Sequence, residues 1–278
     1  MPDFALKNLS LDALFDLALG SDEESDEYWR AVTELWRRGD RATFERACSL
    51  TQEAAEPARI VGVDVLAQLG EGRPFRSEAV PLLESLASPK ESAALVDAAI
   101  TALSHHGERS SEPVVLAHVE HPDADVRFAV AFALPDVCED PPTRSVVDAL
   151  FALMEDEDAH VRDWATFGLG TRLDVDTPEI RDALFARIDD EGEDGDVGGE
   201  ALRGLAVRKD PRAIAPLLEW LAMRDPDPGD LVIDAAEELA DPACLPALYA
   251  LRADWEEGRW SGPLDDAIEA CERSAQRN

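Results

Sequence analysis

Two stretches near the middle of the chain decide its fold: Val126-Arg-Phe-Ala-Val-Ala-Phe-Ala-Leu134 and Val161-Arg-Asp-Trp-Ala-Thr-Phe-Gly-Leu169. Both begin with Val-Arg, carry small residues in the middle and end on leucine, and they start 35 residues apart (161 minus 126). An aspartate stands three residues before each first valine, at Asp123 and Asp158, where its side chain can accept a backbone N–H of a first helical turn. The pattern predicts a helix that recurs with the repeat.

The closing leucine marks further copies along the chain. Similar segments end at Leu66, Leu103, Leu134, Leu169, Leu205 and Leu239. Weaker copies end near Leu35 and Cys271, so we expect about eight units, with atypical capping repeats over 1–40 and 241–278. The sequence therefore predicts a single repeat domain over 1–278.

A second amphipathic stretch precedes most of these segments, so each unit is expected to hold two helices. These stretches are Ala79–Leu86, Val114–Val119, Val146–Met154, Ile180–Ile188, Ile214–Leu221 and Leu245–Leu251. Helix starts are predicted where a capping residue precedes a proline, which lacks the N–H that a first turn leaves unpaired anyway. Such pairs are Thr177-Pro178, Asp210-Pro211, Asp241-Pro242 and Ser88-Pro89. Alternating strand patterns are almost absent, and we expect an all-α superhelix, with 189–197 as an acidic loop.

The composition bounds the class of partner. The net charge is -34, from 60 acidic and 26 basic residues, so the surface should repel nucleic acid and anionic membranes. The acidity can instead serve solubility alone, and that alternative stays open. The four cysteines form no CxxC pair, which argues against a zinc or redox motif and suits a reducing cytoplasm. We expect no metal or cofactor.

The pattern Asp-x-x-Val-Arg-x-x-Ala…Leu resembles HEAT repeats, particularly the bacterial branch named after phycobilin lyase subunits. Arg127 and Arg162 lie in the best matches and Arg59 in a third, whereas Val96, Gly198 and Val232 replace the arginine elsewhere. The resemblance implies an α–α superhelix in which the second helix of each pair lines the concave surface. It implies little about function, because the fold serves many activities.

A helical wheel separates a core face from a second, unusual face. Val126, Val130 and Leu134 share one apolar sector, whereas Phe128 and Phe132 fall at roughly 200° and 240° from Val126. Extending these two positions through the repeats gives a stripe along the predicted concave groove. Its members are Ile60 and Asp64, Asp97 and Thr101, Phe128 and Phe132, Asp163 and Phe167, Gly199 and Arg203, and Ile233 and Glu237. Trp164 flanks the aromatic centre.

The stripe has two interpretations. Grouped aromatics among acids suit the binding of a basic or amphipathic protein segment. Alternatively, Phe128, Phe132 and Phe167 pack against neighbouring second helices as a second core layer. We also expect Trp29 and Trp36, and Trp255 and Trp260, to belong to the first helices, where they would seal the ends of the array.

Catalytic readings find little support in the residues. His118 and His121 have a ligand-like spacing, but His121 precedes Pro122 and should lie beyond a helix end. Repeated His-Glu dipeptides, the mark of the HEAT-type di-iron hydroxylases, are missing, and the charge contradicts a DNA glycosylase. We therefore expect no enzyme but a cytoplasmic protein-interaction scaffold. The alternatives are an immunity-type inhibitor of a basic toxin and a lyase-like enzyme acting on a small molecule.

Overall fold

The computed structural model describes residues 6–190, 196–223, 229–254 and 261–277. Throughout these ranges the chain forms helices joined by turns, with no strand, which confirms the predicted all-α class. The helices divide into two compact units, Met1–Glu139 and Asp140–Asn278. None of the helices in the described ranges has the length and apolarity needed to cross a membrane.

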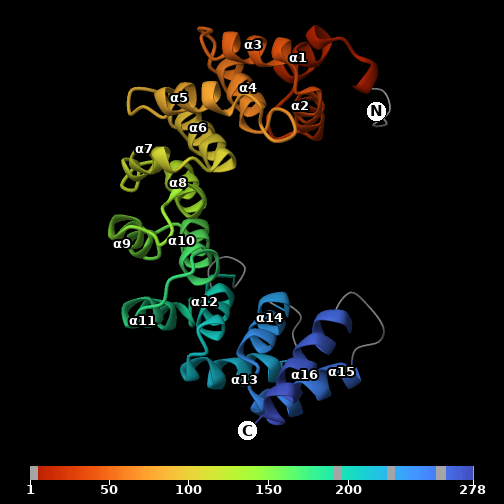
Figure 1. Cartoon of the computed structure of the whole chain (residues 1–278), viewed down its shortest axis with the longest axis vertical. Coiled ribbons are helices and arrows are strands. Elements are labelled where there is room, and N and C mark those ends of the chain that lie inside the picture. Colours follow the sequence, from red (N-terminus) through yellow and green to blue (C-terminus); the bar gives the residue numbers. More distant parts are fainter. Residues whose placement is uncertain (1–5, 191–195, 224–228, 255–260, 278) are drawn as a thin grey trace. The chain divides into compact units, whose positions relative to one another are not determined.

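The described residues of the N-terminal unit form four helix pairs (Figure 1). They are α1 (Leu11–Gly20) with α2 (Asp26–Arg38), α3 (Arg41–Leu50) with α4 (Glu56–Ala67), α5 (Arg76–Leu86) with α6 (Ala93–His106), and α7 (Glu112–Leu116) with α8 (Ala124–Val137). Each first helix packs on its own second helix, and the second helices pack on one another in the order α2, α4, α6, α8. The second helices therefore form one layer and the first helices the other.

The C-terminal unit repeats this arrangement. Its helices are α9 (Arg144–Leu153), α10 (Ala159–Phe167), α11 (Pro178–Arg187), α12 (Asp196–Val207), α13 (Ile214–Met223), α14 (Gly229–Leu239), α15 (Leu245–Asp254) and α16 (Ser261–Ala275). Again the second helices pack in order, α10 on α12, α12 on α14 and α14 on α16. Residues 191–195 of the predicted acidic loop lie outside the described ranges, and so do Trp255 and Trp260.

Most of the predicted helix starts are present. The Asp123 carboxylate accepts the N–H of Asp125 at 3.0 Å, and that of Asp158 accepts the N–H of His160 at 2.9 Å. The start predicted at Ser88-Pro89 is wrong. Residues 88–91 form a turn instead, in which the N–H of Glu91 donates to the carbonyl of Ser88, and α6 begins after Ser92. Ser92 has the extended backbone that a cap needs, and its hydroxyl accepts the N–H of Leu95.

The core follows the apolar sector of the wheel. Val126, Val130 and Leu134 are fully buried in α8, as predicted, and so are Ala133 and Val137. Three of the four cysteines are buried too, and Cys48 is half-buried. All four thiols are free.

A glycine contact fixes the end of α2 beside the end of α4. Gly39 caps α2 in the left-handed conformation (φ 56°), and Gly70, just after α4, has φ 76°. A Cβ on Gly39 would lie 2.6 Å from the Cα of Gly70, so only glycine allows this approach. The N–H of Gly70 then donates to the carbonyl of Trp36 at 2.9 Å, which holds the α2 end in register with α4.

Candidate functional site

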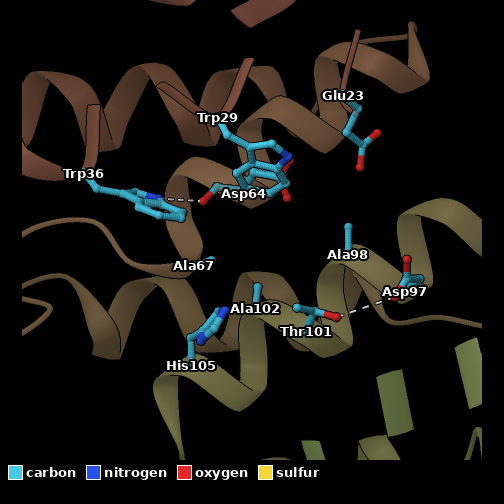
Figure 2. A pocket seen from close by; sticks show the side chains of 10 residues that line it. All are labelled: Glu23, Trp29, Trp36, Asp64, Ala67, Asp97, Ala98, Thr101, Ala102 and His105. Atoms are coloured by element: carbon cyan, nitrogen blue, oxygen red, sulfur yellow. Dashed lines mark hydrogen bonds between the residues drawn. The ribbon is translucent and has the colours of Figure 1, made fainter. Parts of the chain in front are cut away.

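An open cavity of about 170 Å³ lies among α2, α4 and α6 of the N-terminal unit (Figure 2). We call it the tryptophan–carboxylate pocket. It is lined by Glu23, Trp29, Trp36, Asp64, Ala67, Asp97, Ala98, Thr101, Ala102 and His105. Only second helices and the turn before α2 supply these residues, so the pocket opens on the layer where the sequence placed the stripe.

The two tryptophans correct one expectation. Trp29 and Trp36 belong to α2, a second helix, and not to the first-helix surface. Figure 2 shows their indoles on the opposite side of the cavity from the α6 side chains, and their ring centroids lie 6.3 Å apart. The Trp36 indole N–H donates to the Asp64 carbonyl at 2.8 Å, while Trp29 rests edge-on against Tyr28 and stays 41% exposed. The pocket thus has one anchored and one accessible indole.

Asp64 is the deepest acid in the pocket. Asp64 is 9% exposed, and one of its carboxylate oxygens accepts a hydrogen bond from the Tyr28 hydroxyl. Within the described ranges, the other carboxylate oxygen accepts no hydrogen bond. Burial raises the pKa of Asp64 to about 7, and the negative charges of Glu23 and Asp97 add to the rise, against the opposing hydrogen bond from Tyr28.

Asp97 and Thr101 line the same cavity from α6, where their spacing of four residues places them on one face. The Thr101 hydroxyl donates to the Asp97 carboxylate at 3.5 Å, a long contact. Burial raises the pKa of Asp97 to about 7, and the charges of Asp125 and Glu23 raise it further. Protonated and ionised forms of both aspartates are thus present near neutral pH.

No basic group compensates these acids. Across the described ranges, neither Asp64 nor Asp97 forms an ion pair with lysine, arginine or histidine. His105 is the one basic residue of the lining, and its Nε2 lies 3.4 Å from Nε2 of Gln68. Burial lowers the pKa of His105, so its ring is neutral at pH 7. The lining consequently carries negative charge and no cationic side chain of its own, and the nearby charge of Arg73 acts on His105 and forms no ion pair with either aspartate in the described ranges.

The aromatic centre of the stripe divides between the two units. In the N-terminal unit, Phe128 and Phe132 are half-buried on α8, and Phe132 packs edge-on against His105 with centroids 6.0 Å apart. This contact continues the surface from the pocket towards α8. We use the name N-terminal stripe for Trp29, Asp97, Thr101, His105, Phe128 and Phe132.

In the C-terminal unit, Asp163, Trp164 and Phe167 are half-buried on α10, and the two rings meet edge-to-face with centroids 5.5 Å apart. Arg203 of α12 pairs with Asp234 at 3.4 Å, and Glu237 of α14 is exposed. Ile60 and Ile233, also on the predicted stripe, are buried. Trp164 and Phe167, with Asp163 and Glu237, form a second patch, which lies in the C-terminal unit.

Other carboxylates of the C-terminal unit have arginine partners. Asp210 accepts two guanidinium hydrogen bonds from Arg212, at 3.0 and 2.8 Å, and Arg181 approaches to 3.6 Å. Asp190 accepts two from Arg162, at 2.9 and 3.0 Å. The hydrogen bonds from Arg212 lower the pKa of Asp210 to about 2.

The histidines considered as metal ligands hydrogen-bond to backbone groups instead. His118 Nε2 lies 3.1 Å from the carbonyl of Ala87, and His121 Nδ1 accepts the N–H of Asp123 at 3.1 Å. Among the residues that the structure places, no group of three or more acidic, histidine or cysteine side chains could hold a metal ion.

The sequence also contained a pattern that places Trp29 on the stripe, but the predicted stripe was not extended back that far. Phe128, Asp97 and Ile60 each stand six residues before a closing leucine. Trp29 stands six residues before Leu35, so carrying the register back by one repeat places it on the stripe. No comparable signal identifies Glu23, which reaches the pocket from the turn before α2.

Comparisons with known proteins agree with this architecture. The family model for HEAT repeats matches residues 112–194 and 147–240. The X-ray structure of YibA from Escherichia coli is 24% identical with a TM-score of 0.71, covering 98% of this chain and 95% of that one. An engineered protein reaches 17% identity and a TM-score of 0.58, covering 98% and 81%.

The complex of CpcE and CpcF, the phycocyanin lyase of Nostoc, is 13% identical with a TM-score of 0.52, covering 95% of both chains. Identities this low show a shared fold alone and carry no conclusion about activity. No protein of curated function matches the sequence. HEAT repeats are thus recognised directly over residues 112–240, and the paired helices of both units form an all-α repeat fold of the same kind.

Proposed function

We propose that the chain is a protein-binding module and that the N-terminal stripe binds a basic or amphipathic segment of a partner protein. One observation carries the proposal: the tryptophan–carboxylate pocket combines accessible indole surface with carboxylates that have no internal counter-ion. Aromatic side chains supply large contact area at low entropic cost, and uncompensated acids favour a positive partner.

The size of the pocket favours a protein side chain as occupant. Sites that enclose drug-sized ligands have volumes of roughly 300–1,000 Å³. The pocket has about 170 Å³, which suits one side chain and not a chromophore. The half-buried Phe128 and Phe132 extend the apolar surface beyond the pocket, so a partner segment would have contacts along α8 as well.

The C-terminal unit offers a second patch for the same partner class. Asp163, Trp164 and Phe167 form an aromatic and acidic group on α10, with Arg203 and Glu237 on the following second helices. We propose that this patch also contacts protein. The net charge of -34 would accelerate association with a basic partner and make it sensitive to salt.

Partner recovery with charge-conserving variants tests the proposal. Wild type, a Trp29→Ser plus Phe132→Ser variant, and a Phe185→Ser control are used to capture proteins from a lysate of the source organism. Phe185 is 44% exposed but lies on the first helix α11, so the control removes an exposed aromatic from the other layer. All three proteins have the same net charge, so nonspecific attraction of basic proteins is matched.

We expect basic proteins to be recovered by wild type and by the control, and to be depleted at least tenfold with the double variant. Each recovered protein is then titrated in purified form at low and high salt. Equal recovery by the double variant, at equal helical content, would contradict the N-terminal stripe as the binding surface. If the recovery of basic proteins is lost with the Phe185→Ser control instead, the binding surface lies on the first helices.

A further inference from the structure

We infer that the tryptophan–carboxylate pocket is a receptor for one arginine side chain of the partner, with the guanidinium between the indoles of α2 and the carboxylates of α4 and α6. The inference rests on the proposed function and specifies its ligand. It follows from three features of the pocket: its accessible indole, the free oxygen of a buried carboxylate, and the absence of a counter-ion in the described ranges.

The first feature is the pair of tryptophans. Trp36 is fixed, because its N–H donates to the Asp64 carbonyl and its backbone carbonyl accepts the N–H of Gly70. Trp29 stands beside it with 41% of its surface exposed. A cation over the face of an indole is attracted by the ring quadrupole, and tryptophan is the strongest of the aromatic side chains in this respect. The fixed ring makes the site partly preorganised.

The second feature is Asp64. Its side chain lines the cavity, the residue is nine-tenths buried, and only one of its two carboxylate oxygens accepts a hydrogen bond from the described residues, that from Tyr28. The remaining oxygen is not one of the buried unpaired atoms of the described residues, so it is accessible from the cavity and can accept a hydrogen bond from a ligand that carries N–H groups. Quaternary ammonium groups have no N–H and could not form this hydrogen bond.

The third feature is charge. Asp64, Asp97 and Glu23 surround the cavity, Asp125 and Asp123 add negative potential from the start of α8, and neutral His105 adds no positive charge. The raised pKa values of Asp64 and Asp97 express the same imbalance, since each carboxylate is desolvated beside like charges. A bound cation would offset this repulsion.

These features select guanidinium over ammonium. A guanidinium is planar, stacks on an indole, and presents several N–H donors that can reach carboxylates from more than one direction. It is also more weakly hydrated than an ammonium, so its transfer into a half-buried cavity costs less. The volume of about 170 Å³ accommodates a single side chain of this kind.

The test uses Nα-acetyl-L-arginine amide, which mimics an arginine inside a chain and carries one positive charge. Binding is followed at pH 8, where both aspartates are ionised, by the indole N–H resonances of the ¹⁵N-labelled full chain. We expect saturable shifts of the Trp29 and Trp36 indoles. The neutral isostere Nα-acetyl-L-citrulline amide should bind at least tenfold more weakly than the arginine compound. Nα-acetyl-L-lysine amide, whose side-chain ammonium is free, should also bind more weakly than the arginine compound.

Two variants locate the site. Asp97→Asn removes one charge from the pocket without changing its shape, and Glu53→Gln removes one from the exposed turn between α3 and α4. We expect a tenfold loss of affinity for acetyl-arginine amide with Asp97→Asn and less than a twofold change with Glu53→Gln. Equal losses in both variants, or equal binding of the citrulline compound, would overturn the inference, because either result indicates general attraction to an acidic surface.

The outcomes separate this inference from the proposed function. If partner proteins depend on Trp29 and Phe132 while acetyl-arginine amide fails to shift the indoles, the protein-binding face stands and the arginine receptor is wrong. If acetyl-arginine amide binds but no partner protein depends on the N-terminal stripe, the arginine receptor stands and the proposed protein-binding face is wrong. Free L-arginine carries a carboxylate that the acids should repel, so tighter binding of free arginine would identify a small-molecule site and overturn the assignment to a partner.

Discussion

Asp210 in the C-terminal unit is surrounded by arginines, whereas Asp64 in the N-terminal unit is surrounded by a tyrosine, two tryptophans and other acids. Both residues are buried. The hydrogen bonds from Arg212 lower the pKa of Asp210 to about 2, while burial raises that of Asp64 to about 7. The same residue type, at similar exposure, is thus stabilised as a carboxylate in one unit and destabilised in the other.

The difference separates a structural carboxylate from a candidate binding group. A buried ion with its partners satisfied holds helices together, and removing one partner is costly. A buried carboxylate beside like charges lowers stability at neutral pH. Sites that lower stability in this way are commonly retained for function, and the open cavity beside Asp64 gives its free oxygen something to bind. Three substitutions test this comparison.

The largest effect is expected for Asp210→Asn. Asparagine can still cap the short helix at Pro211–Ala213, but it removes the buried carboxylate that pairs with Arg212 and Arg181, which keep only Asp182 and Asp176 as partners. We expect a loss of about 2 kcal/mol in the free energy of unfolding at pH 7, measured by urea denaturation. Because the folded pKa is lowered, the wild-type advantage is present above the unfolded value near 4 and should shrink as the pH falls from about 4 towards 2. An unchanged free energy of unfolding at pH 7 would show that the Asp210 carboxylate does not stabilise the fold.

Asp64→Asn should act in the opposite direction. With a folded pKa near 7 and an unfolded value near 4, the folded state binds more protons between these values, so the contribution of Asp64 to stability is lost as the pH rises through about 7. The variant cannot ionise and should be more stable than wild type by about 1 kcal/mol at pH 8, with a smaller gain at pH 5. Hydrogen exchange of the α4 amides measures the difference. A destabilised variant at pH 8 would mean that the carboxylate is internally compensated.

Tyr28→Phe should have the smallest effect. The Tyr28 hydroxyl donates to Asp64 and is the group that opposes the rise of its pKa. Its removal should raise the pKa of Asp64 further, by less than one unit, in a pH titration of the labelled carboxyl carbon. It should also weaken binding of acetyl-arginine amide at pH 7 more than at pH 9. A lowered pKa would show that Tyr28 does not support the charged form.

The sequence alone predicted the repeat and much of its register. The spacing of small residues and closing leucines identified the second helices, because a helix such as α8, which packs on both α6 and α7, buries residues at these recurring positions. Asp123 and Asp158 predicted helix starts, since capping depends on local backbone geometry. The same register placed Asp97 and Thr101 on the face that lines the pocket.

Only the tertiary structure decided which stripe residues meet and what surrounds them. Register could not show that Tyr28, 36 residues before Asp64, donates to its carboxylate, or that Glu23 reaches the cavity from a turn. Nor could it distinguish Asp64 from Asp210, because the pKa of a carboxyl depends on burial and on neighbouring charges brought in by other helices. Local spacing fixes the helices and their faces, and the packing of helices distant in sequence creates the pocket.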